Sequence, residues 1–139
     1  MMKSYFTKNR VNYIIGAMIA IETIVAIIFY SFLPNKIPMQ WNGVSVNWYT
    51  DKLAIFVYPV ISLAIIFFLK PLIVERFNAP IVSNLAMDGL NFVILSCQIY
   101  TIAYCFGLRW RIDYILLIES ISIVGFSLFM AWKGTRIRI

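Results

Sequence analysis

The chain has 139 residues, of which 62% are hydrophobic and 13% are charged, and its mean hydropathy is +0.85. Ordinary soluble domains are only about 45 to 50% apolar, so a water-soluble fold could not bury this much apolar surface. The formal charge of +6 does not indicate nucleic-acid binding, because the twelve Lys and Arg residues are scattered and form no continuous basic face. The composition therefore predicts an integral membrane protein whose principal partner is the lipid bilayer.

Four apolar segments are each long enough to cross about 30 Å of hydrocarbon as an α-helix. None of them shows the period-two alternation of a barrel strand. We therefore expect a single domain with an all-α fold, a four-helix transmembrane bundle, whose approximate spans are residues 11–33, 53–69, 85–108 and 112–132.

Small and helix-breaking residues indicate how these spans pack. Pro59 is expected to kink the second span, with Ser62 near enough to hydrogen-bond a freed carbonyl. Two pairs of small residues have the small-xxx-small spacing that allows close helix contact, Gly16 with Ala20 and Ser127 with Ala131.

The distribution of basic residues predicts the direction of the spans. If the amino terminus is cytoplasmic, eight basic residues lie inside and four lie outside. The positive-inside rule then places both ends of this multi-pass chain in the cytoplasm. The inner set is Lys3, Lys8, Arg10, Lys70, Arg76, Lys133, Arg136 and Arg138, and the outer set is Lys36, Lys52, Arg109 and Arg111.

Polar side chains within the predicted spans are candidates for function. Glu22 is eleven residues from either end of the first span, near the membrane midplane, and Glu119 lies about 10 Å below the outer edge of the fourth. Hydrogen bonding between helices is the simpler interpretation of a polar stripe in the third span, although an ion path or a polar groove is also consistent with it. An acid at midplane depth favours function for Glu22. The stripe covers a sector of about 140° and consists of Asp88, Asn91, Gln98, Thr101 and Cys105.

The loop between the first two spans is predicted to form an ordered, proline- and aromatic-rich outer cap. Asn42-Gly43 favours a tight turn that would bring Trp41 back toward Trp48 and Tyr49. The aromatic rings would supply stacking and apolar area to a ligand, or would serve only as interfacial anchors. The candidate ligand-binding residues are Pro38, Gln40, Trp41, Asn42, Trp48, Tyr49, Asp51 and Lys52.

A motif in this loop resembles a known signature, LPxxIPxHWN followed by a later Lys. The matching residues are Leu33, Pro34, Ile37, Pro38, Trp41, Asn42 and Lys52, with Gln40 where histidine is usual. Over about its first half the chain thus resembles the SdpI-type immunity family of bacterial membrane proteins, whose amino-terminal domain of unknown function carries the pattern. The resemblance implies a bacterial cytoplasmic membrane and protection against a secreted toxic peptide, sometimes coupled to membrane recruitment of a transcriptional repressor.

Three functions follow as expectations. The first is a membrane-resident immunity or toxin-neutralising protein that engages an extracellular amphipathic peptide through the outer loop. The second is a proton- or cation-coupled carrier, or a subunit of one, that uses Glu22, Glu119 and the amides of the third span. The third is a regulatory anchor whose basic tail, residues 133–139, holds a cytoplasmic regulator or anionic lipid, and self-association is open in each case.

Enzymatic chemistry has no support in the sequence. The chain contains no histidine, so it has neither a Ser-His nor a Cys-His couple. It also has no CxxC motif and no phosphate-binding glycine loop. We therefore predict no catalytic residue, metal site or cofactor, and we interpret Cys97 and Cys105 as packing thiols.

Overall fold

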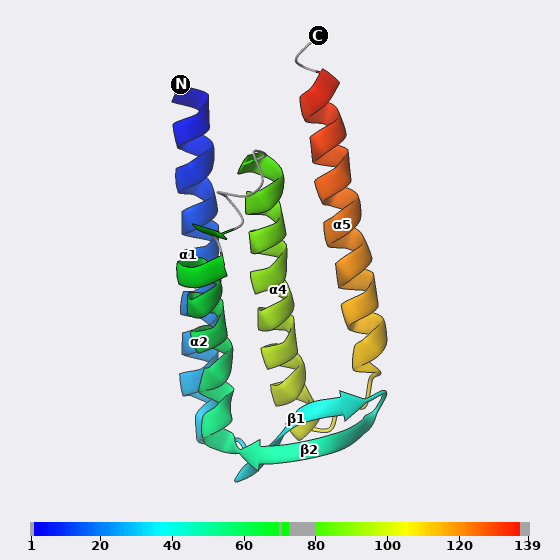
Figure 1. The fold of residues 1–139 in the computed structure, drawn as a ribbon. Coiled ribbons are helices and arrows are strands. Elements are labelled where there is room, and N and C mark those ends of the chain that lie inside the picture. The colour runs from blue at the N-terminus through cyan, green and yellow to red at the C-terminus, as the bar shows by residue number, and fades with distance from the viewer. Residues whose placement is uncertain (1, 70, 73–79, 137–139) are drawn as a thin grey trace.

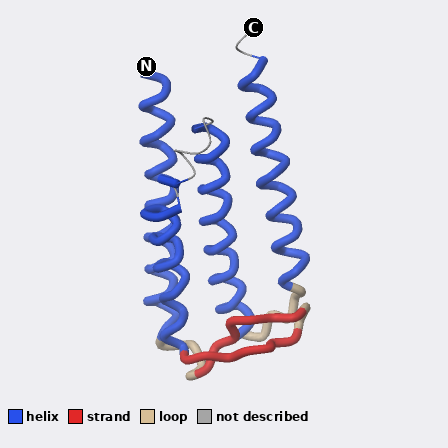
Figure 2. The backbone as a smooth tube through the Cα atoms, viewed as in Figure 1, coloured by secondary structure: helices blue, strands red, loops and turns tan. Residues whose placement is uncertain are grey.

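The computed structural model describes residues 2–69, 71–72 and 80–136. Figures 1 and 2 show long helices running along a common axis, with a β-hairpin lying across one end. Helix α1 begins and helix α5 ends at the opposite end of the bundle (Figure 1), so the two ends are called the hairpin end and the termini end. The elements are α1 (Met2–Tyr30), β1 (Lys36–Asn42), β2 (Ser45–Asp51), the 3-10 helix η1 (Lys52–Phe56), α2 (Val57–Ala64), the π-helix η2 (Ile65–Leu69), α4 (Pro80–Cys105) and α5 (Ile112–Arg136).

Four helical segments in the described part of the chain are long and apolar enough to cross a membrane, which confirms the predicted number of spans. They are Tyr13–Tyr30, Lys52–Leu69, Leu85–Cys105 and Ile112–Phe129. Large apolar side chains cover their outward faces, as expected where lipid and not water surrounds the helices. The fold is that of a multi-pass membrane protein.

The loop between the first two spans is a β-hairpin, so the expectation of an all-α fold was wrong here. Strands β1 and β2 pair antiparallel, and Gly43 and Val44 form the turn between the paired residues Asn42 and Ser45. Gly43 has a φ of 65°, which is the conformation a type II′ turn requires at its first central position. The turn therefore lies one residue beyond the predicted Asn42-Gly43 centre. Pro38 is tolerated because a two-stranded sheet consists of edge strands.

Helices α1, α2 and α4 contact one another and enclose the buried core. The buried positions Ile15, Glu22 and Ala26 on α1 are seven and four residues apart, which places them on one helix face. An apolar cluster around Ile37 and Ile55 fills the hairpin end, and a second one around Ile15 and Met87 lies toward the termini end. The inward faces of these three helices also carry the buried polar side chains of the described bundle, which are Glu22, Ser62, Asn91, Gln98 and Thr101.

Helix α5 packs mainly against α4. The side chain of Ile123 on α5 packs directly on Gly89 of α4, where an added Cβ would lie only 2.6 Å from Cγ2 of Ile123. An open apolar groove of about 300 Å³ follows this contact between α4 and α5 and reaches Met18 of α1. The predicted Gly16–Ala20 contact was wrong for the described part of the chain, where nothing lies within 4 Å of a Cβ built on Gly16. Ser127 lines the groove, and the side chain of Ala131 lies outside those described.

Replacing Gly89 by Ala should separate α4 from α5. The new methyl group would overlap Ile123, whose branched side chain has little freedom to move aside, so the free energy of unfolding should fall by about 1–3 kcal/mol. Unfolding in mixed micelles would measure this change. Gly125→Ala is the matched control and should be nearly neutral, because none of the described residues lies within 4 Å of a Cβ at that position. An equal loss in both variants would contradict the close contact.

Candidate functional site

The carboxyl group of Glu22 lies in the centre of the three-helix core. The hydroxyl of Ser62 on α2 donates a hydrogen bond of 2.9 Å to Oε1 of Glu22, and both residues have no exposed surface. The expectation that Ser62 bonds a carbonyl freed by Pro59 was therefore wrong. Pro59 lies in the first turn of α2, where the missing N–H is tolerated, so the hydroxyl is available to the acid.

The amide of Gln98 links all three helices of the core. Its Nε2 lies 2.9 Å from the backbone oxygen of Glu22 on α1 and 3.4 Å from that of Ile55 on η1. Gln98 is fully buried, and its amide group donates to two backbone carbonyl oxygens that water does not reach. Gln98 thus connects α4 to both of the first two spans.

A second polar contact lies closer to the hairpin. The hydroxyl groups of Tyr58 and Thr101 are 2.6 Å apart, and that of Thr101 also lies 2.9 Å from the backbone oxygen of Cys97. Either hydroxyl could be the donor of the pair, because each also has a second acceptor: the backbone oxygen of Cys97 for Thr101, and the sulfur of Met39, 3.7 Å away, for Tyr58. These groups satisfy one another in the manner of interhelical bonds that stabilise a bundle.

Three buried oxygens of the core have no hydrogen-bond partner within the described structure. They are Oε2 of Glu22, Oε1 of Gln98 and Oδ1 of Asn91. The amide nitrogen of Asn91 bonds the carbonyl of Met87 at 2.9 Å, which leaves only its oxygen unused. We call Glu22, Ser62, Asn91 and Gln98 the polar layer.

The polar stripe predicted on the third span is divided between two environments. Asn91, Gln98 and Thr101 face the core with α1 and α2, whereas Asp88 lines the groove beside α5. Cys105 packs against the apolar cluster at the hairpin end. Glu119 is half-buried on α5, outside the three-helix core, and its Oε2 has no hydrogen-bond partner in the described structure, so the two acids noted in the sequence occupy different parts of the bundle.

The hairpin is attached to α4 through Trp41. Its ring packs edge-on against Tyr100 at a centroid distance of 5.3 Å and against Tyr104 at 6.4 Å. The hydroxyl of Tyr104 also donates to the backbone oxygen of Val44 at 3.3 Å. The prediction that the turn brings Trp41 toward Trp48 and Tyr49 was wrong, because Trp41 packs against α4 and pairs with Val46 across the strands.

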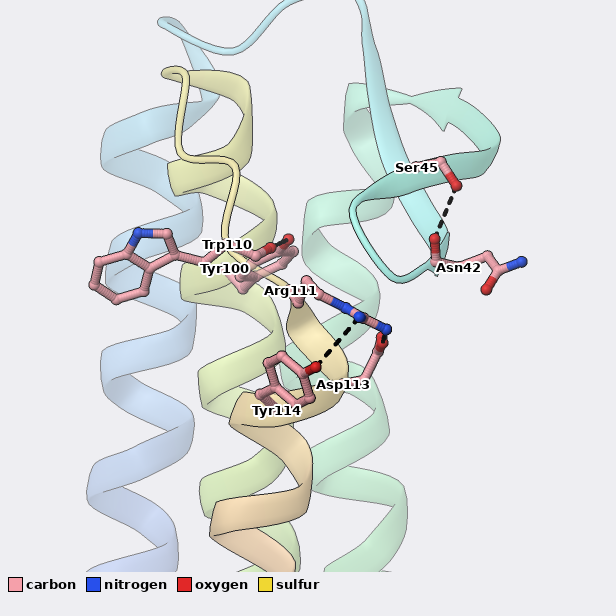
Figure 3. Close-up of polar contacts among 7 residues, drawn as sticks. All are labelled: Asn42, Ser45, Tyr100, Trp110, Arg111, Asp113 and Tyr114. Carbon is pink, nitrogen blue, oxygen red and sulfur yellow. Dashed lines mark hydrogen bonds and ion pairs between the residues drawn. The ribbon is translucent and has the colours of Figure 1, made fainter.

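The connection between α4 and α5 lies beside the turn of the hairpin (Figure 3). A Cβ added to Gly43 would lie 3.5 Å from Nε of Arg111, so the guanidinium group lies against the turn. Asp113 accepts a bond of 2.9 Å from Arg111, which raises the pKa of that guanidinium above its ordinary value. Tyr100 donates to the backbone oxygen of Trp110 in the same connection.

The candidate loop residues have three different roles in the structure. Pro38 is buried beneath the hairpin, and Trp41 anchors it to α4. Asp51 accepts a bond of 2.8 Å from the backbone N–H of Leu53 and so caps η1, while Nζ of Lys52 lies 4.7 Å from the ring centre of Tyr30. The remaining candidate side chains, Gln40, Asn42, Trp48 and Tyr49, are exposed.

Sequence reasoning missed the aromatic residues that hold these parts together. Tyr100 and Tyr104 are four residues apart on one face of α4, a spacing visible in the sequence. Nothing in the sequence indicated that this face would meet Trp41. Tyr58 was likewise not identified, although it follows Ile55 by three positions on the buried face of the second span.

Trp41→Ala should destabilise the hairpin, whereas Trp48→Ala should not. The first change removes the ring contacts with Tyr100 and Tyr104, at a cost of about 2 kcal/mol or more. The second removes a side chain that is 56% exposed and should change the free energy of unfolding by less than about 0.5 kcal/mol. Limited proteolysis at the turn would compare the variants, and equal cleavage rates would contradict the assigned roles.

Comparison with protein families shows a match to a domain of unknown function, DUF1648, over residues 17–63. No curated protein and no solved structure matches the chain. The match covers about a third of the chain and includes Glu22, the whole hairpin and Ser62. The match falls in the half of the chain that carries the loop motif, and the Glu22–Ser62 hydrogen bond joins the α1 part of the matched segment to its α2 part.

Proposed function

We propose that this protein is a small membrane-resident immunity protein that neutralises a secreted amphipathic peptide at the membrane surface. The observation that carries the proposal is the combination of a firmly held hairpin with an outward-facing aromatic strand. Strand β1 contacts α4 and η1, while β2 presents Trp48 and Tyr49, which are 56% and 49% exposed. The resemblance of the loop motif to immunity proteins supplies the physiological context.

Strand β2 has the features of a peptide-binding edge. In the described sheet it pairs only with β1, so its other edge is free to accept an added strand. The register shifts on either side of Gln40 interrupt the usual alternation, and three consecutive residues, Asn47, Trp48 and Tyr49, are exposed. Backbone bonding at the edge would supply affinity, and the two rings would supply apolar contact area.

Charge at the hairpin end favours a particular class of peptide. Four basic side chains are located there and only two acidic ones, Asp51 and Asp113. A strongly cationic peptide would be repelled by this set. The proposal therefore specifies a peptide whose polar face is neutral or acidic. The basic side chains are Lys36, Lys52, Arg109 and Arg111.

The proposal locates the hairpin at the outer surface of a bacterial cytoplasmic membrane, with both ends of the chain in the cytoplasm. The excess of basic residues in the termini-end segments supports this orientation. A peptide arriving from outside would then meet β2 before it reached the lipid core.

Expression in a peptide-sensitive host should protect the cells, and the double change Trp48→Ala with Tyr49→Ala should remove most of the protection. The reason is that these two rings supply the proposed contact area. Survival would be measured against a panel of amphipathic peptides with acidic, neutral and cationic polar faces, at equal membrane expression.

Trp132→Ala provides the matched control for this experiment. Trp132 is 53% exposed, similar to Trp48, but it lies near the termini end of α5. If both aromatic changes reduced survival equally, the rings would be membrane anchors and not a binding surface. Unchanged killing by every peptide would contradict the proposed function.

The orientation can be tested separately by cysteine labelling. In a background with Cys97→Ala and Cys105→Ala, a Ser45→Cys protein should react with an impermeant maleimide in intact cells, because Ser45 is exposed beside the turn. Trp132→Cys should react only after the cells are permeabilised. The reverse pattern would overturn the proposed topology.

A further inference from the structure

The polar layer has hydrogen-bond acceptors that its donors do not satisfy. Ser62 supplies one bond to the carboxyl group of Glu22, and the amide nitrogens of Gln98 and Asn91 are used by backbone carbonyls. Three fully buried side chains are thereby left with one unused oxygen each in the described core, Glu22, Asn91 and Gln98. What the layer lacks is a donor or a positive charge.

The described spans contain no positive charge placed to serve Glu22. Lys52 is the single basic residue in the four spans, and its Nζ lies over the ring of Tyr30 at the hairpin end. The titratable groups on the neighbouring faces of α2 and α4 are Tyr58 and Cys97, and neither becomes positive in any protonation state. The other acids of the described helices, Asp88, Asp113 and Glu119, cannot neutralise a carboxylate either.

Structural hydrogen bonding does not account for the unused oxygens of Glu22, Asn91 and Gln98. The nearby pair of Tyr58 and Thr101 shows what such bonding looks like, because each group there has a partner. In hydrocarbon an isolated carboxylate costs several kcal/mol, so an ionised Glu22 needs compensation. Carboxylate, hydroxyl and amide oxygens are the ligands that hard cations prefer.

The surroundings of the polar layer would retain a bound ion. The apolar cluster with Ala26 and Ile102 separates the layer from the hairpin end, and the cluster with Ile15 and Met87 lies on its other side. The π-helix η2 begins at Ile65, three residues after Ser62. Single π-turns of this kind occur frequently at functional sites.

We infer that the polar layer is an intramembrane binding site for one small monovalent cation, a proton or Na⁺. Glu22 supplies the negative charge and Ser62 orients its carboxyl group. The unused amide oxygens of Gln98 and Asn91, on the face of α4 that is buried in the same core, are the further ligands that the site offers. This inference is independent of the proposed peptide function. Because Gln98 also holds η1, loss of the cation would weaken the contact between the first two spans and α4.

The test uses the full chain in liposomes at constant ionic strength, with choline chloride exchanged for NaCl. Infrared difference spectra would follow the carbonyl band of a protonated carboxylic acid, and thermal unfolding would be recorded in parallel. If Na⁺ is the ligand, adding Na⁺ at fixed pH removes the band and raises the unfolding temperature. If the proton is the ligand, the band disappears only as the pH rises, and NaCl acts no differently from choline chloride.

Three variants assign the response. Glu22→Gln, which preserves shape, should abolish both the band and the stabilisation, whereas the matched control Glu119→Gln should retain them. Ser62→Ala removes a hydrogen bond to the charged carboxyl group and should shift the titration midpoint about tenfold in cation concentration.

Two results would overturn the inference. One is a Glu22→Gln protein whose spectra and whose responses to pH and Na⁺ equal those of the unchanged chain. The other is a response that disappears in Glu119→Gln and persists in Glu22→Gln. Should Glu22→Gln fail to fold, unaltered midpoints in both Ser62→Ala and Gln98→Leu would exclude the site. None of these measurements involves a peptide, so their failure is distinct from failure of the proposed function.

Discussion

The requirement that polar groups inside a bilayer find their partners within the protein determines how these helices are arranged. Glu22 imposes the strictest form of this requirement, because it is an acid near the middle of the first span and has no exposed surface. Ser62 approaches it from α2, and Gln98 bonds its backbone oxygen from α4. Three helices are thereby brought to one point, and the apolar clusters on either side pack around that point.

The hairpin and the polar layer belong to one continuous structural unit. The DUF1648 match begins shortly before Glu22 and ends just after Ser62, so it covers the hairpin together with both halves of that hydrogen bond. Tyr58 lies between the two regions, since its hydroxyl bonds Thr101 and also lies 3.7 Å from the sulfur of Met39 in β1. A peptide on β2 and a cation in the core would therefore act on the same three packed helices.

Hydropathy and helical periodicity could predict much of this fold. They located the four spans, the central depth of Glu22, and the inward orientation of Asn91 and Gln98. Hydropathy cannot report a hairpin in a polar segment with two prolines, so an all-α fold was expected.

The errors concern partners that are distant in the sequence. A small-residue spacing identifies a helix face but not the helix that packs against it. For this reason a helix contact was expected at Gly16, and the contact between Gly89 and Ile123 was not predicted. The strand irregularity around Met39 and the position of α4 directed Trp41 toward Tyr100 instead of toward Trp48. Ser62 was assigned to a local carbonyl because its true partner is forty residues away.

The one-sided attachment of α5 bears on the order in which the chain assembles. The bonds of Glu22, Ser62 and Gln98 involve only α1, η1, α2 and α4, all of which leave the ribosome before α5 does. The polar core can therefore close while the last span is still being inserted. The final helix then joins a preformed surface along α4, a late step that leaves the interior bonds unchanged.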